Sequence, residues 1–268
     1  MELRSAAVAD LFYPGNSKDL EALISRTLKE ATAALPASLG NLKAVIVPHA
    51  GYIYSAQTAA FAFASIIPKD IHRVVLLGPS HRVAFYGMAV PGCDAFETPL
   101  GQIQIDHELR ERALTYADVQ TNDAAHAQEH SLEVQLPFLQ TVLDQFTLLP
   151  ICIGSVEADA VAEVIESFWY DDATLIVISS DLSHFHSYQE ANTIDQLSID
   201  MILQQQSGLS HEQACGATGI NALLIVANRH HLKTQLLDYR NSGDSGGDKE
   251  RVVGYASIAL FNDGEENV

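Results

Sequence analysis

Short runs of aliphatic and β-branched residues alternate along the chain with longer segments whose apolar residues recur at helical spacing. The short runs predict buried strands at residues 43–47, 73–77, 147–153, 174–179, 233–239 and 251–260. The longer segments predict helices at residues 18–34, 55–66, 106–116, 131–145, 156–170, 188–206 and 217–230. This alternation predicts an α/β fold, in which a single domain over residues 1–268 has helices on both faces of a mostly parallel or mixed central sheet.

Some details of this pattern concern the ends of the elements. The strand at 233–239 is expected to run antiparallel to the last strand, because only a short loop separates the two. Ser17 and Ser131 precede apolar helical segments and are expected to cap the helices that follow. A cap at Ser131 would hold Glu129 and His130 just outside the helix.

Composition narrows the class of protein. The 268 residues include 15 Lys and Arg against 34 Asp and Glu, a formal net charge of −19, and 47% are hydrophobic. The apolar content is that of a globular domain. The shortage of basic side chains argues against a partner that is nucleic acid or an anionic membrane surface.

The cysteines and the N-terminal segment indicate the cellular compartment of the protein. Cys93, Cys152 and Cys215 are far apart and odd in number, which favours reduced thiols over a disulfide scaffold. The N-terminal residues have no apolar stretch of the kind found in signal peptides, and no apolar run is long enough to cross a bilayer. We therefore expect a cytoplasmic protein without a membrane segment.

Reactive side chains follow several predicted strands directly. His49, His81 and the pair Asp181 and His184 come after the first, second and fourth strands. Ligands of open α/β sheets bind beyond the carboxyl ends of the strands, so these side chains are expected at one edge. Neutral imidazole is a good ligand for iron, copper and zinc, and the convergence predicts a metal site. Any one of these histidines, taken alone, could instead be a turn residue bonded to the backbone.

Further candidates lie outside these strand ends. The third metal ligand could be Asp181, Glu129 or Cys215. Glu129 could orient His130 as an acid, a base or a substrate contact, or both could belong to a capped surface helix. Cys215 stands just before a helix, whose dipole favours a thiolate that could act as a ligand or nucleophile. The alternative is a small buried residue, which the other two cysteines fit better.

The string GDSGG at residues 243–247 matches the surroundings of the nucleophile in trypsin-like serine proteases. Those enzymes are disulfide-linked β-barrels, whereas this chain alternates strands with helices, so Ser245 is expected to be a chance match. No glycine-rich phosphate-binding fingerprint follows a predicted strand.

Six blocks of the sequence resemble the Memo-like protein family, in the family's order and over most of the chain. They are PHAGYIYS (48–55), GPSH (78–81), EHSLEVQLPF (129–138), SSDLSHF (179–185), Cys215-Gly216 and SGDSGGDKERVVGYAS (242–257). The resemblance implies a fold similar to that of class III extradiol dioxygenases of the protocatechuate type, which are non-haem iron enzymes. It also implies that GDSGG belongs to a family loop.

The resemblance further implies a set of site residues. The metal ligands correspond to His49, His81 and Cys215, and other pocket residues to Asp181 and His184, with His130 as a further candidate. The dioxygenases hold iron through two histidines and a carboxylate, so a thiolate in the third position favours Cu(I), zinc or a different redox poise of iron. Ligation by Asp181, with Cys215 outside the coordination sphere, stays open. Fe(II) is the expected metal, with copper or zinc as alternatives.

These residues lead to three functional hypotheses. The first is a metal-binding protein with redox or oxygen-dependent chemistry on a small substrate. In it, His184 or His130 acts as general acid or base, and Asp181 orients His184 or a metal-bound water. The second is a non-catalytic protein that kept the dioxygenase fold to bind a metal or a peptide. The third is hydrolysis with Cys215 as nucleophile.

The resemblance leaves open whether the protein is an enzyme, and if it is one, it is expected to be a non-haem metal-dependent oxidoreductase. The expected ligand is a small molecule or a peptide. Genes of related bacterial and archaeal proteins often accompany those of an AMMECR1-like protein and a radical SAM protein, which are therefore the expected pathway partners.

Overall fold

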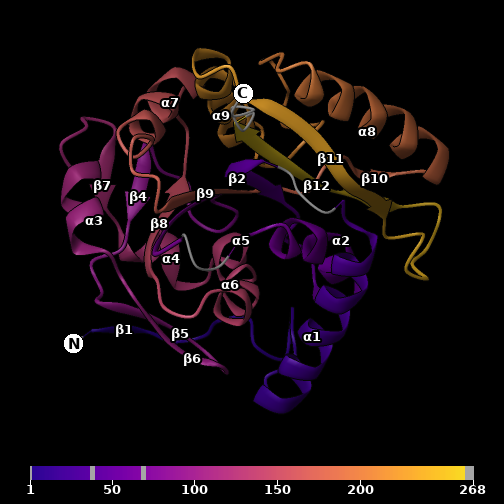
Figure 1. Cartoon of the computed structure of the whole chain (residues 1–268), viewed down its shortest axis with the longest axis horizontal. Coiled ribbons are helices and arrows are strands. Elements are labelled where there is room, and N and C mark those ends of the chain that lie inside the picture. The colour runs from indigo at the N-terminus through magenta and orange to yellow at the C-terminus, as the bar shows by residue number, and fades with distance from the viewer. Residues whose placement is uncertain (1, 37–39, 68–70, 263–268) are drawn as a thin grey trace, which may run out of the picture.

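A nine-stranded sheet forms the centre of the computed structural model, which describes residues 2–36, 40–67 and 71–262 (Figure 1). Its strands are β2 (Asn41–Val47), β3 (Arg73–Pro79), β4 (Met88–Val90), β7 (Val119–Thr121), β8 (Thr147–Ile153), β9 (Thr174–Ser179), β10 (His184–His186), β11 (Lys233–Asn241) and β12 (Val252–Asn262). Their order across the sheet is β10-β12-β2-β9-β3-β8-β4-β7, and β11 pairs with β12.

The middle of the sheet is parallel and its margins are mixed. β2, β9, β3 and β8 are parallel neighbours, whereas β12 runs antiparallel to β2 and β4 runs antiparallel to β8. Residues of the four parallel strands are almost all buried, as expected for strands covered on both faces. The predicted mixed sheet is confirmed, and so is the predicted antiparallel pairing of β11 with β12, in which Leu236 lies opposite Ile258.

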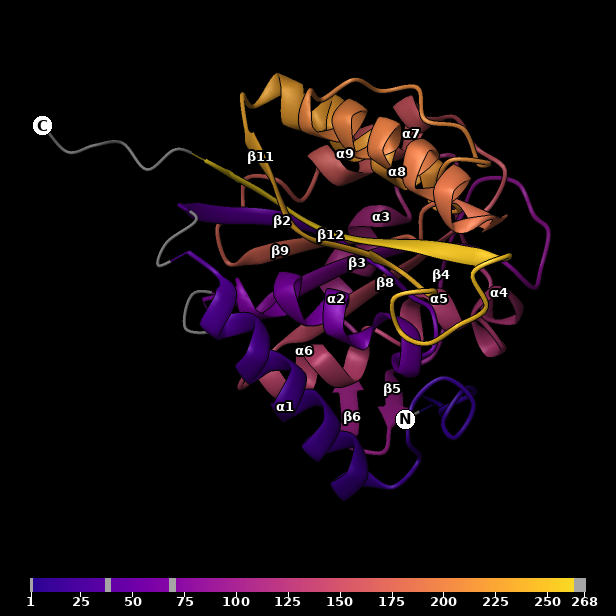
Figure 2. The same ribbon diagram turned by 90° about the vertical axis from the view of Figure 1, so that its right-hand side faces the viewer.

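Helices cover both faces of the sheet (Figure 2). On one side lie α1 (Ser17–Ala34), α2 (Tyr52–Ala64) and α6 (Leu136–Val142), and on the other α3 (His107–Ala113), α7 (Ala158–Glu166), α8 (Tyr188–Leu203) and α9 (Ala217–Arg229). Alternate residues of a strand point to opposite faces. Val45 and Val47 of β2 therefore belong to one apolar core, and Ala44 and Ile46 belong to the other.

Two short helices, α4 (Asp123–Ala127) and α5 (His130–Glu133), lie between β7 and α6 in the chain. The residues of the predicted helix at 131–145 are divided between α5 and α6, with Pro137 in the first turn of α6. A proline there has no amide hydrogen to donate to the preceding turn, so it starts a helix more readily than it continues one. The prediction of one continuous helix is therefore wrong.

The two predicted helix caps also differ from the structure. Asn16, rather than Ser17, caps α1, and its side-chain oxygen accepts hydrogen bonds from the amides of Lys18 and Asp19. Glu129, rather than Ser131, caps α5, so His130 is inside the helix instead of before it. The hydroxyl of Ser131 donates instead to the carbonyl of Pro79, which ties α5 to the end of β3.

A second, three-stranded sheet was not predicted. It consists of β1 (Leu3–Arg4), β5 (Ala95–Thr98) and β6 (Gly101–Gln104), drawn at the lower left of Figure 1. β1 pairs in parallel with β5 across more than ninety residues, with Leu3 opposite Ala95. Over the ranges that the structure describes, no helix combines the length and the apolar character needed to span a bilayer.

Candidate metal centre

The parallel strands β2, β9 and β3 are neighbours, so the segments that follow them meet at one edge of the sheet. His49, Asp181 and His81 each stand two residues beyond the end of one of these strands. One ligand atom from each of His49, His81 and His130 lies within 4.8 Å of the other two. These three side chains are called the histidine cluster below, and their proximity is the convergence that the strand ends predicted for His49 and His81.

The imidazole rings of the histidine cluster pack closely. The rings of His81 and His130 are stacked with their centroids 4.6 Å apart, and His49 meets each of them edge-on at 5.2 and 5.4 Å. Phe12 packs on His130 with a centroid distance of 4.5 Å. Burial, and then repulsion from a neighbouring ring, lowers the pKa of His49 and of His130, so the packing favours the neutral form of these two imidazoles.

Glu129 orients His81. One carboxylate oxygen of Glu129 lies 2.9 Å from Nδ1 of His81, and the other accepts the backbone N–H of His81 at 2.6 Å. Burial alone would raise the pKa of Glu129, but the hydrogen bonds from His81 and from the amide of Ser131 outweigh it and lower the pKa to about 2. Because an ionised carboxylate can only accept, His81 donates from Nδ1, which leaves the lone pair on Nε2 for a ligand.

His49 is 1% exposed and held at both ring nitrogens. Nδ1 lies 2.9 Å from the hydroxyl oxygen of Ser179, and Nε2 lies 3.1 Å from Sγ of Cys215. Burial, followed by repulsion from His81 and His130, lowers the pKa of His49 well below its usual value. His49 is therefore neutral, which is the state that a metal requires of an imidazole.

Cys215 lies beside His49, but not within 4.8 Å of all three members of the histidine cluster, because the N-terminus of α9 comes close to the end of β9. A side chain on Gly216 would meet Cβ of Ser180 at 2.7 Å, so only glycine fits there. Burial, together with the charge of Asp181, raises the pKa of the Cys215 thiol to about 12. The metal-free protein therefore favours the thiol and not the expected thiolate, because burial and Asp181 outweigh the hydrogen bonds that lower the pKa of Cys215.

The side chain of Asp181 holds the backbone of His49 in place. Its carboxylate accepts the amide of His49 at 2.7 Å, which fixes the turn after β2 against the turn after β9. Burial raises the pKa of Asp181 to about 7, although the amides of His49 and Ala50 oppose the shift. Of the alternatives for the third ligand, Asp181 and Glu129 are each engaged in positioning a histidine, whereas Sγ of Cys215 directly adjoins Nε2 of His49.

His130 and His184 differ in how their rings are held. Nδ1 of His184 donates to the carbonyl of Leu182 at 2.8 Å, which leaves Nε2 as an acceptor. Nδ1 of His130 lies 3.3 Å from a carboxylate oxygen of Glu129 but is buried without an aligned hydrogen bond. Burial lowers the pKa of His130 to about 4, although the charge of Glu129 opposes the shift. Glu129 thus orients His81, not His130 as the sequence suggested.

A pocket of about 420 Å³ opens on the candidate centre. Its lining includes Phe12, Tyr54, His130, Asp181, His184 and Arg251. The volume is that of a small-molecule site. Asp181, His130 and His184, the residues predicted to do acid–base chemistry, therefore share one cavity. Cys215 and His81 line a neighbouring pocket of about 410 Å³ instead.

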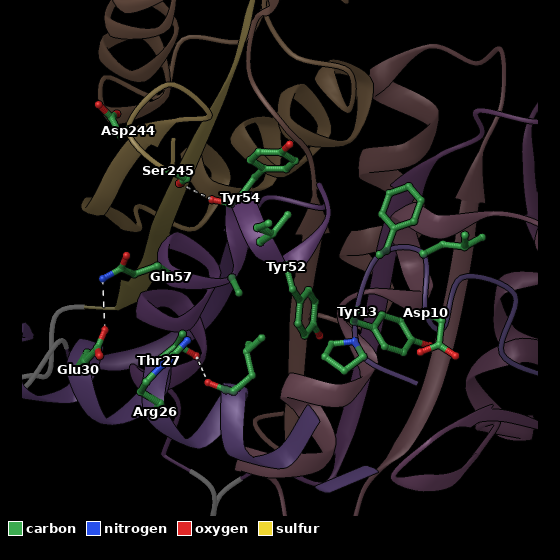
Figure 3. A pocket seen from close by; sticks show the side chains of 16 residues that line it. Asp10, Tyr13, Arg26, Thr27, Glu30, Tyr52, Tyr54, Gln57, Asp244 and Ser245 are labelled. Atoms are coloured by element: carbon green, nitrogen blue, oxygen red, sulfur yellow. Dashed lines mark hydrogen bonds between the residues drawn. The ribbon is translucent and has the colours of Figure 1, made fainter. Parts of the chain in front are cut away.

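A wider pocket of about 770 Å³ lies between the N-terminal loop, α1 and α2 (Figure 3). Phe12 and Tyr54 line both this pocket and the one that contains Asp181. No histidine or cysteine of the described residues lines the wider pocket. Ser245 of the GDSGG string lies at its rim, where its hydroxyl donates to the carbonyl of Tyr54, and not beside a histidine as a protease nucleophile would.

Some residues of the site were missed by sequence reasoning. Ser179 and Gln135 are buried and connect His49 to α5 and α6, and nothing in the spacing of the sequence indicated their contact. Ser179 is the last residue of β9, so the rule that placed Asp181 and His184 at the sheet edge could have included it. Gln135 carries no such signal, since it lies between two short helices.

The donors fit a transition metal. Nε2 of His81 has no hydrogen-bond partner among the described residues, and Nε2 of His49 faces only the Cys215 thiol. Two imidazoles and one sulfur are a donor set that suits iron, copper or zinc and not magnesium or calcium.

Comparisons with known sequences match one protein family over nearly the whole chain. The sequence model of the Memo-like protein family matches residues 4–259. A MEMO1 family protein of Aquifex aeolicus (strain VF5) is 36% identical over 277 residues, covering 97% of this chain and all of that protein. A MEMO1 family protein of Archaeoglobus fulgidus is 34% identical over 271 residues, with 96% of this chain and 99% of that protein covered.

A structural comparison supports the fold. An uncharacterized protein of Escherichia coli K12 aligns with a TM-score of 0.53 at 10% identity, over 82% of this chain and 99% of that chain. At this identity the likeness concerns the fold alone. The family match, the relatives above 30% identity and the arrangement of the strand-end residues lead to one conclusion: the chain belongs to the Memo-like protein family.

Proposed function

We propose that this protein binds one transition metal ion, Fe(II) in the first place, through His49, His81 and Cys215. The observation that carries the proposal is the meeting of ligand atoms from His49, His81 and His130 within 4.8 Å, with Sγ of Cys215 at 3.1 Å from Nε2 of His49. Copper and zinc are the alternatives, because a thiolate next to imidazoles suits all three metals.

The third ligand has two candidates, each with its own support. Cys215 is the residue that the family resemblance implies, and its sulfur adjoins His49. His130 is the residue whose ligand atom lies within 4.8 Å of those of His49 and His81. We assign the position to Cys215, because His130 also lines the pocket beside Asp181 and His184, where an acid–base group is needed.

In the proposed site, a bound metal supplies Lewis acidity and, as iron or copper, one-electron chemistry. The chain's own residues bind and orient a small oxygenated or phenolic substrate in the pocket of about 420 Å³. Nε2 of His184, with its lone pair, accepts a proton from the substrate. Asp181, with a pKa of about 7, holds or releases a proton near neutral pH.

The proposal is tested by anaerobic purification and metal analysis. We expect about one iron per chain in the wild type and a trace amount in the His49→Ala/His81→Ala double variant. His72 and His107 are exposed histidines outside the cluster, so a His72→Ala/His107→Ala variant is the matched control and should keep its iron. Equal metal contents in the wild type and the His49→Ala/His81→Ala variant would refute the proposal.

The third ligand is tested with single variants of the two candidates. Cys215→Ser should lower iron affinity more than His130→Ala if the sulfur coordinates the metal, because serine keeps the size of the side chain but not the soft donor. The opposite order would assign the position to His130.

Catalysis and pure binding are separated by oxygen uptake. Iron-loaded protein is mixed with a panel of catechols, and consumption of O₂ above that of the Asp181→Asn variant indicates an oxidoreductase. No O₂ consumption at full iron occupancy favours the non-catalytic alternative, a protein that binds a metal or a peptide. Hydrolysis by Cys215 is disfavoured, because its thiol is protonated at neutral pH. The cytoplasmic location and the AMMECR1-like and radical SAM partners stay predictions.

A further inference from the structure

We infer that Ser179 and Gln135 fix His49 as the tautomer protonated at Nδ1, so that Nε2 carries the lone pair that faces Cys215 and the proposed metal. The two residues are positioning residues, since they act through His49. The tautomer itself is a property of the metal-free protein, whereas its effect on metal affinity rests on the proposed function.

The hydroxyl of Ser179 has three hydrogen-bond neighbours. Its oxygen lies 2.5 Å from the carbonyl oxygen of Ser131, 2.8 Å from Nε2 of Gln135 and 2.9 Å from Nδ1 of His49. Ser179 is fully buried, and the residues Gln135 and His49 are each 1% exposed. Water therefore does not compete for these bonds, and the donors and acceptors must balance among the four groups.

The carbonyl of Ser131 sets the direction of the first bond. A carbonyl oxygen accepts but never donates, so the single proton of the Ser179 hydroxyl must point to Ser131. What remains on the Ser179 oxygen is lone-pair density, and the other two neighbours must therefore be donors.

Gln135 is one of these donors. Its Nε2 lies 2.9 Å from the carbonyl oxygen of Pro48 and 2.8 Å from the Ser179 hydroxyl, so its two amide hydrogens are both used. The reversed amide would set its oxygen against the carbonyl oxygen of Pro48, which is a repulsive contact of two acceptors.

His49 has to be the other donor. Its Nδ1 carries the proton that the Ser179 oxygen accepts, and a neutral imidazole then has its lone pair on Nε2. The Cys215 thiol, 3.1 Å away, can donate to that lone pair in the metal-free protein. Without the Ser179 hydroxyl, His49 loses this acceptor at Nδ1, so the alternative tautomer, in which Nε2 donates to the sulfur, costs less than in the wild type.

His49 and His81 thus reach the same tautomer by different means. His81 is held by the ionised carboxylate of Glu129, and His49 is held by a neutral hydroxyl. A neutral partner avoids a further buried charge beside Asp181, which accepts the His49 amide.

The experiment is ¹⁵N NMR of the metal-free, histidine-labelled protein, in which protonated and unprotonated ring nitrogens have well-separated shifts. The His49 signals are assigned by their loss in His49→Gln. We expect a protonated Nδ1 and an unprotonated Nε2 in the wild type. In Ser179→Ala we expect a shift of the tautomer population toward a protonated Nε2 and about tenfold weaker Fe(II) binding under anaerobic conditions.

Two further variants separate positioning from a general loss of packing. Ser179→Thr keeps the hydroxyl and should keep the wild-type tautomer. Ser257→Ala removes another fully buried hydroxyl, which donates to the carbonyl of Thr58, and should leave the His49 signals and Fe(II) affinity unchanged.

A protonated Nε2 in the wild-type spectrum would overturn the inference without any variant, and so would an unchanged tautomer in folded Ser179→Ala. The inference and the proposed function fail separately. If the tautomer responds as expected but neither protein binds Fe(II), the metal proposal fails and the tautomer assignment stands. If Fe(II) binds with equal affinity to both while the tautomer is unchanged, the reverse holds.

Discussion

Helix α5 separates two buried polar clusters that use their hydrogen-bonding groups in opposite ways. At its last residue, Glu133 accepts four hydrogen bonds, from the Arg4 guanidinium, the Tyr13 hydroxyl and the amides of Ala7 and Val8. Arg4 also donates to the carbonyls of His126 and Glu129. The group of Arg4, Tyr13 and Glu133, called the Glu133 cluster below, therefore satisfies itself.

The histidine cluster, which includes the first residue of the same helix, His130, does not satisfy all its hydrogen-bonding groups. The Nδ1 atoms of His49 and His81 are bound by Ser179 and Glu129, but no described residue besides Cys215 offers a hydrogen bond to their Nε2 atoms. The completely paired charge of Glu133 holds the N-terminal segment in place, whereas ring nitrogens without a full set of partners are available to a ligand. The Glu133 cluster therefore has the features of a structural group, and the histidine cluster has the features of the binding site proposed above.

The largest effect is expected for Glu133→Ala. It leaves the Arg4 guanidinium buried without its carboxylate, so the free energy of unfolding should fall by about 3–5 kcal/mol. Urea unfolding measures this, and Glu21→Ala, at an exposed position of α1, is the control with a change within about 0.5 kcal/mol. A loss under about 1 kcal/mol would show that the Glu133 cluster is not structural.

Acid should weaken the region around the Glu133 cluster through His126. Burial lowers the pKa of His126 to about 4, so in the folded state it stays neutral where the unfolded chain is protonated. His126 therefore costs no folding free energy above about pH 6.5. As the pH falls from 6.5 toward 4, the free energy of unfolding decreases by about 3 kcal/mol, because only the unfolded chain binds the proton. Urea unfolding from pH 7 to 4.5 should show a shallower decline for His126→Gln, and parallel declines would contradict this assignment.

A bound metal should stabilise the folded protein only when the histidine cluster is intact. Fe(II) at a hundred times its dissociation constant should raise the free energy of unfolding by about 2.7 kcal/mol in the wild type. The gain should vanish in His49→Ala/His81→Ala and after treatment with a chelator. A similar gain in that double variant would mean that the ion binds elsewhere.

The smallest effect is expected for Tyr13→Phe, which removes one of the four donors to Glu133 and leaves three. We expect a loss of about 1.5 kcal/mol in urea unfolding and no change in Fe(II) affinity. A large fall in Fe(II) affinity would show that the two clusters are coupled through α5 and do not have separate roles.

The sequence was informative where one element decides the outcome by itself. The parallel strands are continuous apolar runs, and the rule on strand ends places His49, His81, Asp181 and His184 at one edge without knowledge of the packing. The same rule says nothing of distances, so it did not tell which side chains touch. His130 enters the cluster from a separate helix, 51 residues after the end of β3 and 83 residues after the end of β2.

What the sequence missed depends on contacts between distant segments. The helix at 131–145 is broken between Glu133 and Leu136, where Gln135 turns inward to Ser179 instead of continuing one amphipathic face. The strands β1, β5 and β6 have two to four residues each, too few for a periodic pattern. The pKa of Cys215 follows burial that only the folded chain creates.

The most direct test is an anomalous-difference map from crystals of the iron-loaded protein. We expect one iron peak about 2.0–2.2 Å from Nε2 of His49 and of His81, and about 2.3 Å from Sγ of Cys215. A peak bound through Nδ1 of either histidine, or a site distant from both rings at full iron loading, would contradict this expectation.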